Sequence, residues 1–308
     1  MNIPSGCVDR RPFEHLLVAT DFSAGAAQAI ARAALLPLAA RGRVTVVHVL
    51  PDLASKKVLA EAEKLARRNL QQAVRTFGGA AALLGRRDLR LSSDLCHGPA
   101  YAEIIRHARS VAAELIVLGR HGRRPVRDMF IVSTAERVIR AGDLPVLIVS
   151  RRAARAYRRP LLAVDLDDAS RAVVTVALRA LAPEVTQATM IHAYHVPFEG
   201  FVTPEALPWE MTDARKEYRK AAASSLAKLQ ATLADGGMQW RTLLVCDDAR
   251  NAIVTAAKRV RADLVAVGTH GRSGIAHALL GSVAEWVIQA APCDVLVARP
   301  ARVTFRLP

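Results

Sequence analysis

The sequence predicts two tandem, doubly wound α/β domains, each with a five-stranded parallel sheet flanked by helices. The first observation is an internal repeat: residues 44–48 (VTVVH) resemble 188–192 (ATMIH), and residues 113–119 (AELIVLG) resemble 262–268 (ADLVAVG). The second is that short apolar runs alternate with longer amphipathic stretches in both halves. Because consecutive parallel strands need a crossover between them, this alternation favours a mostly parallel sheet in each half.

The length and composition agree with two globular domains, since the chain has 308 residues and 52% of them are apolar. We assign residues 1–150 to the first domain, 151–159 to an arginine-rich linker and 160–308 to the second domain. The four cysteines are scattered, which excludes a disulfide scaffold and a zinc ribbon and favours a cytoplasmic location. No apolar run reaches the roughly 20 residues of a membrane helix, and the N-terminus lacks a signal-peptide pattern.

The first half contains nine expected elements. Residues 16–19 and 44–50 are short and apolar, as is typical of buried strands. Residues 23–40 form an alanine-rich stretch with Ser23 as its predicted N-cap, and residues 56–77 carry apolar side chains on one helical face. The remaining elements are strands at 89–95, 115–118 and 146–149 and helices at 100–112 and 134–141.

The second half repeats this order. Strands are expected at 161–164, 189–193, 241–246, 264–267 and 295–298, and helices at 170–181, 213–234, 252–260 and 283–290. The last strand of each copy is a natural sheet edge. We therefore expect these edges to pair between the copies, which makes the chain a pseudo-dimer, or between chains, which makes a homodimer.

A glycine pattern follows the fourth strand of the second copy, where Gly268, Gly271, Gly281 and Ser282 fit G-x2-G-x9-G-S. Glycines let the backbone approach a ligand closely, and free N–H groups at the start of the next helix suit an anion. Ligands of doubly wound sheets bind outside the carboxyl ends of the strands. The pattern predicts a phosphate site, and the alternative is a flexible loop capped by Ser282.

With this motif and four repeated segments in a constant order, the chain resembles a tandem universal stress protein. The resemblance covers nearly all of the sequence except the first dozen residues, the linker and the last few. It implies the adenine-nucleotide α-hydrolase-like, Rossmann-like fold. It also implies ATP binding, with or without Mg²⁺, through the G-x2-G-x9-G-[ST] motif of the second copy.

The resemblance assigns roles to particular residues of that copy. Asp165 would hold the ribose side of the nucleotide, the backbone of Ala193 would face adenine, and Val267 and Thr269 would wall the pocket. The implied nucleotide-binding set is Asp165, Ala193, Val267, Gly268, His270, Gly271, Arg272, Gly281, Ser282 and Val283.

The second copy departs from the family pattern in two pairs of acidic residues, at 167–168 and 247–248. Carboxylates close to a triphosphate would repel it unless Mg²⁺ intervenes. At the start of a helix, the same charges are favourable because they face the positive end of the helix dipole. We favour this second interpretation.

The first copy keeps Gly119 and Gly122, but Val132 stands where the third glycine is expected, and Pro125 removes a backbone donor. A β-branched residue disfavours positive φ and fills the space that a phosphate would approach. We therefore expect a degenerate copy without an ordinary ATP site. Its arginines at 120, 123, 124 and 127 either grip another anion or form a solvated basic loop, the interpretation we favour.

Catalytic motifs are missing from the sequence. There is no G-x-S-x-G elbow and no G-x-x-x-x-G-K-[ST] loop, so we expect neither acyl transfer nor fast ATP turnover. His192, His270 and His277 do not have the spacing of a zinc site, so we expect no metal ligation by them.

The net charge of +15 raises nucleic acid as a partner. However, Phe130 and Tyr157 are the only aromatics available for stacking near the arginine clusters, and known DNA-binding motifs are missing from the sequence, which disfavours that partner. The sequence thus predicts a stress-response regulatory protein that binds ATP in its second domain, is non-catalytic or a slow ATPase, and acts on an unidentified protein partner. The alternatives are a nucleotide-independent interaction scaffold and, less favoured, a basic nucleic-acid-associated protein.

Overall fold

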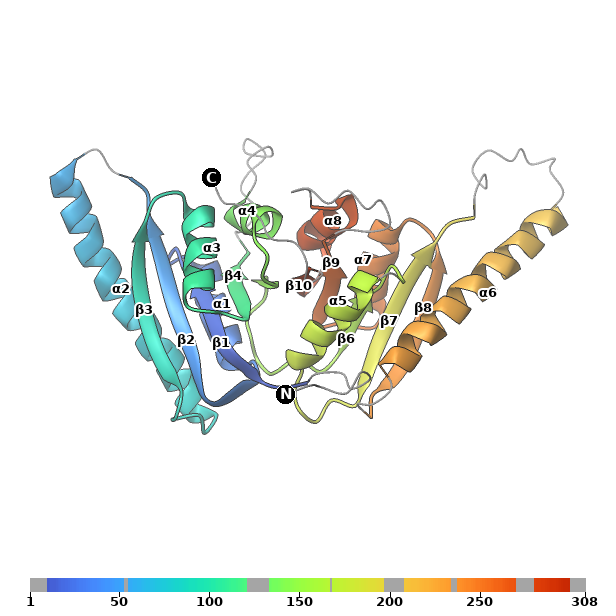
Figure 1. The fold of residues 1–308 in the computed structure, drawn as a ribbon, viewed down its shortest axis with the longest axis horizontal. Helices are drawn as coiled ribbons and strands as arrows, with labels where there is room; N and C mark the ends of the chain where they lie inside the picture. Colours follow the sequence, from blue (N-terminus) through green and yellow to red (C-terminus); the bar gives the residue numbers. More distant parts are fainter. Residues whose placement is uncertain are drawn as a thin grey trace.

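A computed structural model describes residues 10–52, 55–120, 133–166, 168–196, 208–233, 237–269 and 280–299; the side chains of 168, 169 and 208–212 are not considered. Ten strands form one sheet in the order β3-β2-β1-β4-β5-β10-β9-β6-β7-β8. Each half of this sheet has the 3-2-1-4-5 order of a doubly wound, Rossmann-like fold. Figure 1 shows the two halves side by side, with α2 and α6 at the far ends.

The first half contributes five strands and four helices. The strands are β1 (Phe13–Ala19), β2 (Leu38–Leu50), β3 (Arg90–His97), β4 (Leu115–Gly119) and β5 (Val146–Val149). The helices are α1 (Ala24–Ala34), α2 (Lys56–Leu83), α3 (Ala100–Ser110) and α4 (Thr134–Ala141). Strand pairs within this half are parallel, as the sequence predicts.

The second half repeats the arrangement. Its strands are β6 (Pro160–Ala163), β7 (Gln187–Tyr194), β8 (Gln239–Cys246), β9 (Leu264–Gly268) and β10 (Asp294–Ala298). Its helices are α5 (Asp168–Arg179), α6 (Pro208–Thr232), α7 (Ala249–Arg259) and α8 (Ser282–Ala290). These strands are also mutually parallel.

The two halves join at their last strands. β10 pairs antiparallel with β5, with Leu296 opposite Leu147. The predicted pairing between the copies is therefore present, and the two five-stranded sheets are continuous rather than separate. No helix among the described residues is both long and apolar enough to cross a bilayer.

Apolar side chains form one core on each face of the sheet. One core contains residues of α1, α2, α5 and α6, and the other contains residues of α3, α4, α7 and α8. Both cores include side chains of β5 and β10, for example Leu147 and Leu296 in the first and Ile148 and Val295 in the second. The hydrophobic layers consequently run across the joint.

One predicted helix is too long. The expected stretch 23–40 divides, because α1 ends at Ala34 and β2 already begins at Leu38, which pairs with Phe13. Pro37 explains the break, since proline cannot donate within a helix and disfavours helical geometry in the residue before it. Ser23 is the N-cap of α1, as predicted, with its hydroxyl accepting from the Ala26 N–H.

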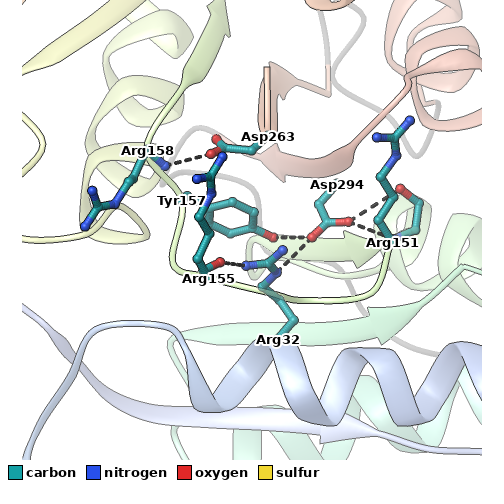
Figure 2. Close-up of polar contacts among 8 residues, drawn as sticks. Arg32, Arg151, Arg155, Tyr157, Arg158, Asp263 and Asp294 are labelled. Carbon is teal, nitrogen blue, oxygen red and sulfur yellow. Dashed lines mark hydrogen bonds and ion pairs between the residues drawn. The ribbon is translucent and has the colours of Figure 1, made fainter. Parts of the chain in front are cut away.

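Two aspartates of the second half hold the linker (Figure 2). Asp294 accepts from the Ser150 and Arg151 N–H groups and from the Tyr157 hydroxyl. Asp263 accepts from the Arg158 and Arg159 N–H groups, at 2.9 Å each. The arginine-rich linker is thus fixed through its backbone, which leaves several of its guanidinium groups at the surface.

Candidate nucleotide site

The predicted site lies at the carboxyl ends of β6, β7 and β9, where the strand order of the second half reverses. Asp165 comes two residues after the end of β6 and is half-buried. Its N–H donates to the Ser170 hydroxyl at 3.1 Å, and the next residue, Leu166, has φ +62°. This left-handed residue turns the chain sharply from strand into α5, so that Asp165 stays at the sheet edge.

His192 fixes the neighbouring strand end. Its Nδ1 lies 2.8 Å from the Val164 carbonyl oxygen, so Nδ1 carries the proton and donates. His48 makes the same bond to Thr20 in the first half, at 2.7 Å. Each histidine thus makes a hydrogen bond at the end of its strand. Ala193, which follows His192, is half-buried at the edge where adenine is expected.

Both ends of the glycine loop are described, and they meet. Val267 and Thr269 are buried, and Gly268 between them is half-buried at the end of β9. The Thr269 N–H donates to Ala298 O at 3.2 Å, while the Thr269 carbonyl accepts from the Gly281 N–H at 2.8 Å. The end of β9 is thereby bonded directly to the start of α8. Residues 270–279, which include the predicted His270, Gly271 and Arg272, lie outside the described residues.

Gly281 is the N-cap of α8, and Ser282 is its first helical residue. Within the described residues, the N-cap of this helix makes no side-chain hydrogen bond to the first turn. The first-turn N–H groups, including that of Val283, therefore lack the acceptor that an N-cap side chain usually supplies. Capping by Ser282, the alternative interpretation of the loop, is wrong.

The third glycine of the motif does not have the positive φ that we expected at this position. Gly281 has φ −62° and ψ 145°, a conformation open to any residue. Positive φ is consequently not what a valine at this position would violate. Glycine leaves this N-cap without a Cβ, an arrangement that suits the close approach of an anion to a helix start.

The corresponding helix of the first half, α4, closes its own N-terminus. The Ser133 hydroxyl accepts from the Glu136 N–H at 3.2 Å, and the Glu136 carboxylate accepts from the Ser133 N–H at 2.9 Å. This reciprocal capping box places a fixed negative charge on the helix start. It would repel a phosphate there, in agreement with the prediction of a degenerate copy.

Gly119 is retained in the first half for packing. A Cβ on Gly119 would lie 2.3 Å from the carbonyl carbon of Gly25, so the end of β4 touches the backbone of α1. The Phe22 ring packs against the His48 ring, with 4.3 Å between the ring centroids. The Asp21 carboxylate accepts from the Ser23 N–H at 3.0 Å. In the first half, Asp21 and His48, which occupy the positions of Asp165 and His192, therefore make contacts within the protein.

One residue of the two acidic pairs is explained by the structure. Asp248 is the N-cap of α7, accepting from the Arg250 N–H and pairing with the Arg250 guanidinium at 2.8 Å. These hydrogen bonds lower the pKa of the Asp248 carboxyl to about 2. The interpretation as helix N-terminal charge is confirmed for this residue. Asp168 opens α5, and Asp167 lies outside the described residues.

Other predicted groups do not gather at this edge. Within the described ranges, no three histidine, cysteine or acidic side chains form a cluster that could hold a metal ion. Arg120 donates to the Gln289 carbonyl of α8, whereas residues 121–132 of the same basic loop lie outside the described residues. Sequence reasoning did not identify Ser170 as the residue that holds Asp165, although a hydroxyl near the start of α5 was the available signal.

A family model described as "Universal stress protein family" matches residues 12–150 and again residues 156–299. The chain belongs to the universal stress protein family. A universal stress protein of Mycobacterium tuberculosis is 29% identical over 192 residues, which covers 61% of this chain and 62% of that protein. The aligned part therefore spans less than two thirds of that relative.

A second universal stress protein, YxiE of Bacillus subtilis, is 30% identical over 150 residues, and the match covers 46% of this chain and 99% of that protein. Among solved structures, a universal stress protein of Archaeoglobus fulgidus has a TM-score of 0.64 with 16% identity, covering 93% of this chain and 98% of that one. This likeness shows the fold of two universal stress domains in one chain. The predicted family, tandem arrangement and fold class are confirmed.

Proposed function

We propose that the second domain binds an adenine nucleotide of the ATP class and that its occupancy regulates a stress-related interaction, without fast hydrolysis. The observation that carries this proposal is the contrast between the two equivalent helix starts. α8 begins at a glycine without a capping side chain, whereas α4 is closed by its own serine and glutamate. Of these two helix starts, and among the described residues, α8 alone has first-turn N–H groups that no N-cap side chain accepts from, and such groups suit an anion.

The surrounding residues fit a nucleotide. The N–H groups of Ser282 and Val283 and the Ser282 hydroxyl would hold phosphate oxygens. Asp165 would accept from ribose hydroxyls, and the chain at Ala193 would meet the base. Glu285, in the first turn of α8, pairs with Arg140 at 3.1 Å, which offsets its charge near the phosphates.

Slow turnover is proposed because the sequence has no P-loop lysine and no identified base to orient an attacking water. Mg²⁺ would reduce repulsion between the triphosphate and nearby carboxylates. The first domain, with its sealed helix start and its glycine contact, would serve as a structural partner. The protein partner, a homodimer and the cytoplasmic location remain predictions.

Calorimetry of the full chain with ATP, with and without Mg²⁺, tests the proposal. We expect saturable binding of one nucleotide per chain, lost in Gly281→Val. Gly122→Val changes the second motif glycine of the first copy and should leave binding unchanged. Folded protein that takes up no nucleotide at millimolar ATP would instead support a nucleotide-independent scaffold.

A further inference from the structure

A second cavity lies at the opposite edge of the same domain. It has a volume of about 350 Å³ and is formed at the amino ends of β6, β7 and β8. Its lining includes Arg158, Arg159, Glu184, Thr189, Arg241 and Val260. Because it lies at the starts of the strands, it is separate from the proposed nucleotide site at their carboxyl ends.

At the equivalent place in the first half, the amino ends of β1, β2 and β3, the side chain of His15 fills the space. His15, which is 2% exposed, places Nδ1 2.8 Å from the Val111 carbonyl oxygen and Nε2 2.8 Å from the Thr45 hydroxyl. The Thr45 hydroxyl continues to Ser92, at 3.0 Å. A closed hydrogen-bonded chain therefore crosses β1, β2 and β3.

Strand register gives the matching residues of the second half. Thr45 is paired with Leu17 and Ser92, just as Thr189 is paired with Leu161 and Arg241. Arg241 therefore stands in the place of Ser92.

The other two positions follow in the same way. His15 precedes Leu17 by two residues, and Arg159 precedes Leu161 by the same spacing, so Arg159 replaces the histidine. Val111 and Val260 are the C-caps of α3 and α7. Val111, whose carbonyl is bonded to His15 in the first half, thus corresponds to Val260, which lines the cavity.

These replacements open the cavity and make it positive. Arg159 and Arg241 are both exposed, and within the described part of the chain neither guanidinium has a partner. Arg158 differs, because its guanidinium pairs with Glu184. The Thr189 side chain, 9% exposed, lies on the wall between the two free arginines and likewise has no described partner.

We propose that this cavity binds a small molecule bearing a phosphate group. Two guanidinium groups can each present a pair of parallel N–H donors to phosphate oxygens, and the Thr189 hydroxyl is a third donor group. The volume lies at the lower end of small-molecule sites, which span about 300–1,000 Å³. A compact phosphate compound therefore suits the cavity better than a nucleic-acid backbone.

Titration of the full chain with inorganic phosphate at low ionic strength tests the proposal, read from the side-chain Nε–Hε NMR signals of arginine. We expect saturable shifts at Arg159 and Arg241, and at least tenfold weaker binding in Arg159→Gln and in Arg241→Gln. The matched controls are Arg43→Gln and Arg90→Gln, which remove exposed arginines that pair in register across the filled edge of the first half. These controls should bind phosphate like the unaltered chain.

Three outcomes would overturn the proposal. Equal, unsaturable shifts at Arg43 and Arg90 would show ordinary counterion attraction. Loss of the response in Gly281→Val would show that phosphate reports on the nucleotide site. Shifts at Arg159 and Arg241 with a single-stranded oligonucleotide but not with phosphate would assign the arginines to a nucleic-acid surface instead.

Discussion

The guanidinium of Arg32, on α1 of the first domain, lies 2.9 Å from the carboxylate of Asp294, the first residue of β10 in the second. Both residues are buried, with Asp294 only 1% exposed. Arg32 also donates to the Arg155 carbonyl at 2.6 Å and lies 4.1 Å from the Tyr157 ring centroid. This ion pair joins the first domain to the second, and the contacts of Arg32 with Arg155 and Tyr157 attach the linker to both (Figure 2).

Asp294→Asn should destabilise the chain by about 3–5 kcal/mol, because it leaves the Arg32 charge buried without its partner. Urea unfolding measures this change. The double variant Arg32→Met/Asp294→Asn should be less destabilised than the sum of the single variants, since it removes the stranded charge. The control is Arg158→Gln, which removes an exposed ion pair with Glu184 and should lower the unfolding free energy by less than about 1 kcal/mol. A strictly additive double variant would show that the pair does not couple the domains.

Gly281→Ser should stabilise α8 by a few tenths of a kcal/mol, because serine is a somewhat better N-cap than glycine and the backbone here accepts it. The new hydroxyl would occupy the N–H groups proposed for phosphate, so nucleotide affinity should fall. Thermal unfolding and ATP calorimetry together measure the two effects.

The equivalent change in the first domain gives the control. Ser133→Ala should destabilise by about 1 kcal/mol through loss of the α4 cap, with nucleotide binding unchanged. If Gly281→Ser bound ATP like the unaltered chain, the start of α8 would not be the phosphate site.

The order of the elements was predictable because burial patterns and the internal repeat are local in sequence. The ion pair of Arg32 with Asp294 was not, since its partners lie 262 residues apart in the chain. The same holds for the continuous sheet, for which the sequence could identify edge strands but not choose between pairing within a chain and between chains.

The candidate site was only partly predictable for a related reason. Gly281 follows from the glycine motif and Asp165 from the family resemblance, but neither states why the residue is needed. Gly119 is required for backbone packing, whereas Gly281 is an N-cap without a capping side chain, where we propose that phosphate binds. The distinction depends on what each glycine faces across the fold.

Gly119→Ala should be strongly destabilising, because the new Cβ would lie 2.3 Å from the carbonyl carbon of Gly25. Relief of this clash requires β4 or α1 to move and repack. We expect a loss of about 1–3 kcal/mol or more in unfolding free energy. Gly79→Ala in α2 is the matched control, because nothing lies within 4 Å of its Cβ. That change should stabilise by about 0.5–1 kcal/mol, since alanine is the better helix former. Equal effects at the two positions would contradict the assigned contact.

Burial lowers the pKa of the His15 imidazole from its ordinary 6.5, and the charges of Arg43 and His107 act in the same direction. The Val111 hydrogen bond and Glu114 oppose this shift without reversing it. Because the unfolded chain takes up a proton more readily than the folded chain, stability should be full above pH 6.5 and decline as the pH falls below it. Protonated Nε2 would donate to the Thr45 hydroxyl, which could then donate only to Ser92, so the direction of this chain of hydrogen bonds would reverse.

His15→Gln removes the titrating group, so the difference between variant and unaltered chain should depend on pH. Urea unfolding from about pH 5.5 to pH 7.5 should show a decline toward acid that is smaller in His15→Gln. His97→Gln, at the more exposed end of β3, is the control and should retain the full decline due to His15. Parallel pH profiles for the unaltered chain and His15→Gln would mean that the buried histidine accepts its proton without cost to the fold.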